Sequence, residues 1–220
     1  NPLRTIFISE AKQYGLKYAT GLYMLVSQAV KTFEAFMDTN MDESVVPSLV
    51  KALEKKKTNL VLIGMPEAGK TKLAKEISFL SSFQYIDTNE EIEKLIGSSI
   101  SSYLKEHSIA EFRALEEQVV SKVSLATHSI ISTGNDVVLR DRNISRLKQN
   151  GIVFFYDKPL SQMKPSFENP LCSSFGKIER LYQERYHLYL SYCDCHVRPS
   201  DSLKETAAEI LKHYDDKIIV

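Results

Sequence analysis

The feature that most constrains the fold is the stretch GMPEAGKT at residues 64–71, which has the spacing G-x-x-x-x-G-K-[ST]. The chain has only 8 glycines among 220 residues, so two glycines at this spacing are unexpected by chance. A short apolar run, residues 59–64, precedes the stretch, and a helical pattern over residues 69–82 follows it. Strand, loop and helix in this order predict a phosphate-binding loop in an α/β domain.

The residue types of this loop suit a nucleotide. Backbone N–H groups of residues 65–71 can surround an anion, and the helix that starts at Gly69 adds its positive dipole end. We expect Lys70 to reach the β- and γ-phosphates of ATP and the Thr71 hydroxyl to ligate Mg²⁺. The alternative is a glycine-containing turn with a solvated lysine. The predicted nucleotide-binding residues are Gly64, Met65, Pro66, Glu67, Ala68, Gly69, Lys70 and Thr71.

Strand and helix patterns alternate beyond the loop. We expect five short strands, at residues 59–64, 83–87, 129–133, 151–157 and 193–197. Between and after them, helical patterns cover residues 69–82, 90–97, 99–107, 110–127, 140–150, 178–193 and 201–214. This alternation predicts a five-stranded parallel sheet with helices on both faces, a three-layer α/β sandwich.

The residues before the first strand form a different unit. Helical patterns at residues 5–14 and 21–37 are followed by a polar stretch and by a short helix after Pro47 that ends in the charge run EKKK. The second of these patterns places Leu22, Leu25, Val26, Val30, Phe33 and either Phe36 or Met37 at helical spacing. We therefore divide the chain into a helical extension at residues 1–57 and a sheet domain at residues 58–220.

Composition argues against several classes of partner. Lys+Arg and Asp+Glu number 28 each, so no net charge favours nucleic acid or a membrane surface. No apolar run approaches the roughly 20 residues needed to span a bilayer. The three cysteines, Cys172, Cys193 and Cys195, form no disulfide framework and no zinc pattern. Free thiols in a reducing, cytoplasmic environment are the simplest interpretation.

Several blocks in order resemble the shikimate kinase family, from about residue 59 to residue 214. These blocks are GMPEAGKT, YIDTNEEIEKLIG, AEFRALEEQVV, IISTGNDVV, NPL and ERYHLY. The resemblance implies the P-loop fold of nucleoside-monophosphate kinases. It also implies an enzyme that uses ATP and Mg²⁺ to phosphorylate shikimate to shikimate 3-phosphate in aromatic amino-acid biosynthesis.

The resemblance assigns roles to individual residues. Asp87 matches the first aspartate of the family's D-x-D motif, near the metal and the reacting hydroxyl, and would act with Lys70 in catalysis; the alternative is a helix N-cap. Arg113 and Arg185 match the two arginines that hold the shikimate carboxylate, a task for which planar guanidinium groups are suited. For each of them the alternative is a salt bridge on a helix surface.

The chain departs from the family pattern at three places. Asn89 replaces the second aspartate of D-x-D, Gly134-Asn135-Asp136 replaces a run of three glycines, and Asn169 replaces an arginine in a lid over residues 160–177. In one interpretation the acceptor pocket is rebuilt, and Asp136 supplies the carboxylate that Asn89 lacks. In a second, the domain binds ATP without catalysing transfer; in a third, it phosphorylates a related small hydroxy acid.

Residues 1–37 resemble the C-terminus of shikimate dehydrogenase, through NPLRT and GLYMLVSQAVKTFEAF. The resemblance would place Gln28 against shikimate and Gly21 and Met24 beside the nicotinamide. The alternative is an ordinary amphipathic helix. No G-x-G-x-x-G motif is present, so we expect no hydride transfer from these residues alone. A dehydrogenase end followed by a kinase implies one fused polypeptide, with a dehydrogenase domain upstream.

Overall fold

Five strands form one parallel sheet in the computed structural model, which describes residues 2–18, 20–166 and 172–218 and not the side chains of residues 6, 9, 12 and 13. The strand order across the sheet is β2-β3-β1-β4-β5, and all four neighbouring pairs are parallel. The strands are β1 (Asn59–Ile63), β2 (Gln84–Asp87), β3 (Ser129–Ser132), β4 (Gly151–Tyr156) and β5 (Cys195–Val197). The predicted five-stranded parallel sheet is therefore confirmed.

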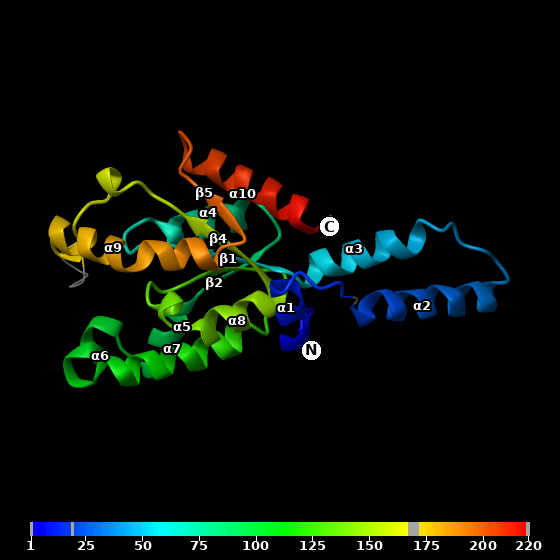
Figure 1. Cartoon of the computed structure of the whole chain (residues 1–220), viewed down its shortest axis with the longest axis horizontal. Helices are drawn as coiled ribbons and strands as arrows, with labels where there is room; N and C mark the ends of the chain where they lie inside the picture. Colours follow the sequence, from blue (N-terminus) through cyan, green and yellow to red (C-terminus); the bar gives the residue numbers. More distant parts are fainter. Residues whose placement is uncertain (1, 19, 167–171, 219–220) are drawn as a thin grey trace.

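The layers follow from the direction of each crossover. The step from β1 to β2 runs one way along the sheet, while the steps from β2 onward run the other way. Right-handed crossovers then place α4 on one face and the helices from α5 to α9 on the other, and α10 returns to pack on α4 (Figure 1). These helices are α4 (Lys70–Leu80), α5 (Thr88–Ile96), α6 (Ile100–Glu106), α7 (Ile109–Val123), α8 (Asp141–Asn150), α9 (Phe175–Tyr192) and α10 (Leu203–Ile218).

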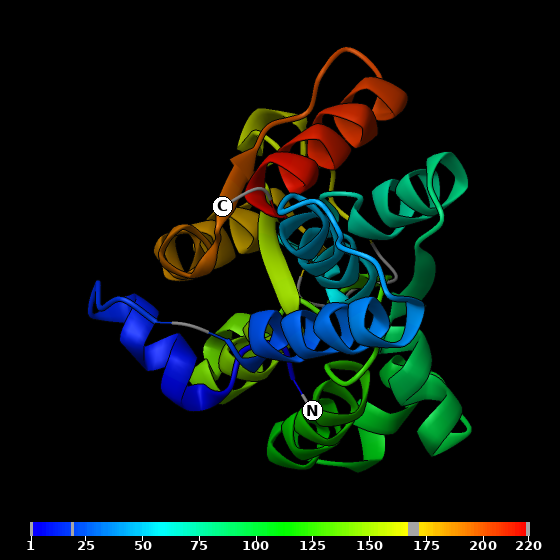
Figure 2. The same ribbon diagram turned by 90° about the vertical axis from the view of Figure 1, so that its right-hand side faces the viewer.

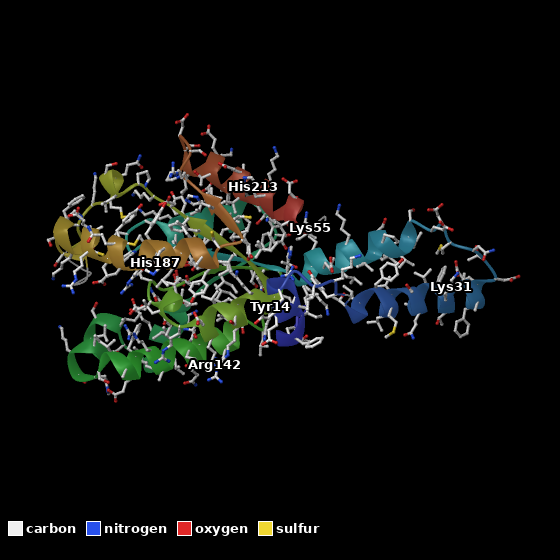
Figure 3. The ribbon with its side chains drawn as sticks, viewed as in Figure 1. Tyr14, Lys31, Lys55, Arg142, His187 and His213 are labelled. Atoms are coloured by element: carbon white, nitrogen blue, oxygen red, sulfur yellow. The ribbon has the colours of Figure 1, made fainter. Side chains whose placement is uncertain are left out.

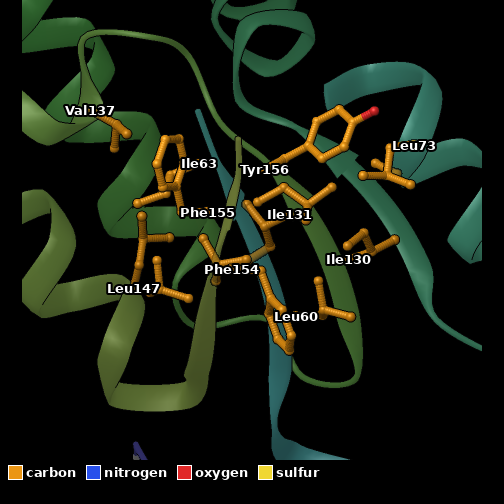
Figure 4. Packing of buried hydrophobic residues seen from close by; sticks show 14 of the residues in the cluster. Leu60, Ile63, Leu73, Ile130, Ile131, Val137, Leu147, Phe154, Phe155 and Tyr156 are labelled. Atoms are coloured by element: carbon orange, nitrogen blue, oxygen red, sulfur yellow. The ribbon is translucent and has the colours of Figure 1, made fainter. Parts of the chain in front are cut away.

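The three central strands form the core. Every residue of β1, β3 and β4 is buried, as expected for apolar runs covered on both faces, whereas the edge strands β2 and β5 are only partly buried. Figure 4 shows Leu60, Phe154 and Ile130 from these strands packed with Leu73 of α4 and Leu147 of α8. Burial of each such side chain stabilises the fold by about 1.5–3 kcal/mol.

Several element boundaries differ from the sequence prediction by a few residues, and two of them have a clear local reason. Strand β5 begins at Cys195 rather than residue 193, because α9 continues to Tyr192 and the Cys193 N–H caps it by donating to the Tyr189 carbonyl. Helix α3 (Val45–Lys57) begins before Pro47, which lies in the first turn where a missing N–H costs nothing. Short 3₁₀ turns, η1 (Val137–Leu139) and η2 (Leu160–Gln162), were not predicted.

The predicted helical extension is present as α1 (Ile6–Gln13), α2 (Gly21–Met37) and α3. Helices α2 and α3 pack side by side and project away from the sheet, as Figures 1 and 2 show. The inner end of α3 is fixed to α10, because the Tyr214 hydroxyl donates to the carbonyls of Lys55 (3.1 Å) and Thr58 (2.8 Å). Figure 3 places Lys55 at this junction and Lys31 far out along α2.

The apolar stripe predicted for α2 is only partly buried. Val26 and Val30 are covered, but Leu25, Phe33 and Phe36 are exposed, the last with 85% of its surface accessible. The main packing partner of α2 among the described residues is one helix, α3, which covers a narrow strip of its surface. A broad apolar face therefore remains in contact with solvent. No helix within the described residues has the length and apolar character needed to span a membrane.

Candidate active site

The phosphate-binding loop follows the carboxyl end of β1. Gly64 has a φ of +155°, and a Cβ at this position would lie 2.7 Å from the Tyr156 carbonyl oxygen, so only glycine fits there. Gly69 precedes α4 with a φ of +97°, and Glu67 also has a positive φ, of 59°. These left-handed residues curve the backbone around the N-terminus of α4, where the helix dipole favours an anion.

Lys70 lies inside this loop with only 7% of its surface exposed. Its Nζ donates to the carbonyl oxygens of Gly64 (2.8 Å) and Met65 (3.0 Å) and to Oδ1 of Asn135 (3.1 Å). Burial lowers the pKa of the Lys70 ammonium to about 8, although the nearby charges of Asp87 and Glu67 act in the opposite direction. Within the described residues no carboxylate forms a salt bridge with Nζ, so this buried cation is suited to receive a phosphate.

The carboxylate of Asp87, at the end of β2, faces the same loop. Its Oδ2 accepts a hydrogen bond of 2.9 Å from the Thr71 hydroxyl, and its Oδ1 accepts one of 2.9 Å from the Asn89 backbone N–H. Asp87 is thus the N-cap of α5 and a neighbour of the phosphate loop at once. Both oxygen ligands predicted for Mg²⁺ are therefore adjacent.

This pair of oxygens fits the chemistry of a bound Mg²⁺. Magnesium in kinases commonly takes one or two protein oxygens and completes its coordination with phosphate oxygens and water. Within the part of the chain that the structure describes, no group of three or more His, Cys, Asp or Glu side chains could hold a metal alone. Thr71 and Asp87 would accordingly hold the ion together with the phosphates of ATP.

Gly134 lies between the side chains predicted to contact the acceptor. Its N–H donates to the buried Thr88 hydroxyl at 2.8 Å. A Cβ at Gly134 would be 2.9 Å from Oδ1 of Asn89 and 3.0 Å from Oε1 of Glu116. Glycine therefore keeps open the space where these two polar groups converge. Asn89 itself remains exposed.

The two arginines predicted to hold a carboxylate converge on Asp136. Arg185 Nη1 donates to Oδ1 of Asp136 at 2.7 Å, and Arg113 Nη2 lies 3.7 Å from Oδ2. Arg185 has only 6% of its surface exposed, which rules out the alternative of a surface salt bridge for this residue. The Asp136 carboxylate therefore faces the arginines. In one interpretation of the sequence it was to supply the carboxylate that Asn89 lacks, but Oδ1 of Asn89 lies next to Gly134.

Glu116 was not singled out from the sequence, yet it belongs to this pocket. The side chain is 1% exposed, and its Oε2 has no hydrogen-bond partner among the described residues. Burial first, and then the charge of Asp136, raise the pKa of the Glu116 carboxyl to about 7. The F-R-x-x-E spacing could have revealed it, because residues three apart lie on the same side of a helix.

Asn135 connects the nucleotide side of the pocket with the acceptor side. Its side-chain oxygen accepts from Lys70, and its carbonyl accepts from Arg185 Nη1 (3.3 Å) and from the Tyr189 hydroxyl (3.1 Å). All the predicted site residues thus lie around the carboxyl ends of β1, β2 and β3 and on the helices that face them. Asn169, the third departure from the family pattern, lies outside the described residues.

A cavity of about 740 Å³ lies elsewhere, where α1 meets α8 and the start of β4. Charged residues of both signs line it, among them Arg4, Lys148 and Asp194. No predicted site residue does, and the convergence of buried polar groups described above is the better guide to the chemistry.

Comparison with known proteins agrees with the sequence resemblance. A family model described as Shikimate kinase matches residues 66–215. Shikimate kinase from Thermodesulfovibrio yellowstonii is 31% identical over 164 residues, which cover 71% of this chain and 95% of the relative.

Solved structures of similar shape support the same fold. Shikimate kinase from Aquifex aeolicus superposes with a TM-score of 0.64 and 28% identity, and covers 73% of this chain and 98% of its own. The enzyme from Acinetobacter baumannii, solved in complex with shikimate, has a TM-score of 0.69 at 23% identity and covers 76% of this chain and 98% of its own. At that identity the second likeness concerns the fold alone.

Proposed function

Because the chain belongs to the shikimate kinase family, it is a phosphotransferase that uses ATP and Mg²⁺, and we propose that it converts shikimate to shikimate 3-phosphate. The observation that carries this proposal is the juxtaposition of three groups. The buried Lys70, the Thr71–Asp87 pair and the arginines Arg113 and Arg185 surround the carboxyl ends of neighbouring strands. A phosphate donor and an acidic acceptor would meet there.

On the nucleotide side, residues 64–71 would wrap the phosphates with backbone N–H groups. Bound MgATP would supply the transferable phosphoryl group, with the metal neutralising part of its charge. Lys70 would turn from the Gly64 and Met65 carbonyls toward the γ-phosphate, and thereby stabilise the charge that develops there.

On the acceptor side, Asp87 would orient the attacking hydroxyl and accept its proton. Arg113 and Arg185 would hold the carboxylate, while Asn89 would accept a hydrogen bond from a ring hydroxyl. Gly134 leaves the backbone open to close approach by the ligand. A neutral amide is a weaker acceptor than a carboxylate, so binding of the ring hydroxyls through Asn89 should be weak.

A coupled assay of ADP release tests the proposal, with and without shikimate. We expect ADP release that depends on shikimate, and Lys70→Met should lower it about a thousand-fold or more. Lys72→Met, which removes an exposed lysine on the same helix, is the matched control. MgATP binding by calorimetry without any shikimate-dependent turnover would instead favour a non-catalytic nucleotide-binding module.

One observation favours the second candidate function, a non-catalytic nucleotide-binding module. Asn135 and Asp136 stand where the family has glycines. The Asn135 side chain bonds to Lys70, which the nucleotide would need, and the Asp136 side chain bonds to Arg185, which the acceptor would need. Turnover with another small hydroxy acid, but none with shikimate, would favour the third interpretation.

We further propose that residues 1–57 are the C-terminal part of a shikimate dehydrogenase and a linker, joined to the kinase of residues 58–220. The exposed apolar face of α2 supports this, because such a face is suited to packing against another domain. Gly21, Met24 and Gln28 are exposed and follow one another on one side of the helix. The coding sequence upstream of residue 1 should encode a dinucleotide-binding unit, and its absence would contradict the fusion.

We propose that the kinase and the fused dehydrogenase act in the cytoplasm. Cys172, Cys193 and Cys195 are all free thiols, which persist in a reducing compartment. Localisation of the tagged full-length polypeptide in cells tests this, and recovery outside the cytoplasm would contradict it.

A further inference from the structure

We propose that Asp136 is an internal competitor of the acceptor: its carboxylate occupies the arginine pair that the proposed function assigns to the carboxylate of shikimate. The inference rests on that proposed function for the identity of the ligand. It assigns to Asp136 a role in setting acceptor affinity, separate from phosphoryl transfer itself.

The geometry of the contacts is that of a bound anion. A carboxylate oxygen lies 2.7 Å from Arg185 Nη1, a normal length for a charge-assisted hydrogen bond, and the other oxygen lies 3.7 Å from Arg113 Nη2. The carboxylate thus sits between two guanidinium groups from α7 and α9, which are far apart in the sequence. A second carboxylate would therefore have to compete with Asp136 for Nη1 of Arg185 and for the positive charge of Arg113.

The charges in the pocket lead to the same conclusion. Arg113 and Arg185 contribute two positive charges, and Asp136 and Glu116 provide two carboxyl groups, of which Glu116 is partly protonated near pH 7. The charges of these four groups therefore nearly cancel. An added carboxylate would give it excess negative charge unless Asp136 moved away from the arginines.

The local backbone does not oppose that movement of Asp136. It precedes the 3₁₀ turn η1 with a φ of −85°, and its side chain caps no N–H of that turn. Among the described residues, its carboxylate contacts Arg113 and Arg185. Rotation of the side chain into solvent would break these contacts and leave the backbone hydrogen bonds of Asn135 and η1 in place.

Binding of shikimate would then include the cost of removing Asp136 from the arginines. One charge-assisted hydrogen bond corresponds to about 10- to 100-fold in affinity. The same competition would make the wild-type protein almost indifferent to whether the acceptor has a carboxylate at all. An uncharged acceptor of the same shape, such as the methyl ester of shikimate, would bind nearly as well as the acid.

The experiment measures binding by titration calorimetry and does not depend on turnover. Shikimate and its methyl ester are titrated into the wild-type chain and into Asp136→Asn, which keeps the shape and removes the charge. We expect Asp136→Asn to bind shikimate about 10- to 100-fold more tightly, with little change for the ester. Asp216→Asn, an exposed carboxylate near the end of α10, is the matched control and should change neither.

Each outcome of the titrations either supports or overturns the proposed role of Asp136. Tighter shikimate binding by Asp136→Asn supports the competitor, whether or not ADP release shows the chain to be an active kinase. Unchanged or weaker binding overturns it, while shikimate-dependent ADP release would still uphold the proposed function. Binding of shikimate to neither protein also overturns it, because the vacated arginines would then take no carboxylate. If Asp136→Asn does not fold, Asp136→Gly replaces it, since a φ of −85° suits glycine equally well.

Discussion

Glu116 should make the stability of the protein fall as the pH rises, and Glu116→Gln should remove that dependence. The carboxyl is 1% exposed, and one of its oxygens has no hydrogen-bond partner among the described residues. Its pKa in the folded protein is about 7, against an ordinary value of 4.5. The folded state therefore holds this proton more tightly than the unfolded chain does.

The sign and size follow from proton linkage. The contribution of Glu116 to stability is fully present below about pH 4.5 and is lost as the pH rises through 7. At about 1.36 kcal/mol per pH unit, the loss is about 2–3 kcal/mol between pH 5 and pH 8. A glutamine of the same shape stays neutral throughout, so its advantage over the wild type should grow by this amount.

Urea unfolding without ligands at pH 5, 6, 7 and 8 measures the difference in free energy of unfolding between the two proteins. Glu179→Gln, which removes an exposed carboxylate on α9, is the control and should run parallel to the wild type. A Glu116→Gln advantage that is the same at pH 5 and pH 8, to within about 0.5 kcal/mol, would refute the reasoning.

Three further predictions concern the backbone and the pocket. Gly64→Ala should lower the free energy of unfolding by about 2–4 kcal/mol in urea titrations, because its Cβ meets a carbonyl at 2.7 Å, whereas Gly176→Ala, with open space around it, should not destabilise. Asn89→Asp combined with Asp136→Gly should raise kcat/KM for shikimate more than either change alone; a double variant no better than the best single one would contradict this. Asp87→Asn should lower kcat about 100- to 10,000-fold in the ADP-release assay, and activity close to wild type would remove Asp87 from the chemistry.

The strands were predictable from the sequence because parallel strands buried on both faces are continuous apolar runs. NLVLI and GIVFFY became β1 and β4 almost as expected. The start of β5 was not predictable from the alternation of Cys193 and Cys195. That pattern suits a strand that begins at residue 193, and it suits equally a helix that ends there with a strand beginning at Cys195. The exposure of Phe36 on α2 could not be foreseen either, because periodicity identifies an apolar face but not what covers it.

In the candidate site, too, some residues were predictable from local sequence and others were not. Gly64, Lys70 and Thr71 follow from a local motif whose geometry is repeated wherever the pattern occurs. The contact of Asp136 with Arg185 joins residues 49 positions apart in the chain, and no local pattern specifies it. Glu116 is intermediate: its spacing from Arg113 was visible, but its burial and its raised pKa depend on packing around α7.

The position of Asn135 has a consequence for the order in which ligands act. Its side chain holds Lys70, and its carbonyl holds Arg185, so the ammonium and the guanidinium share one residue as a support. A nucleotide that draws Lys70 away would break its hydrogen bond to the Asn135 side chain. Asn135 could then shift, and the position of Arg185, which bonds to the Asn135 carbonyl, would change with it. Thermodynamic reciprocity then requires the acceptor to alter nucleotide affinity by the same factor, so the two substrates should bind cooperatively rather than independently.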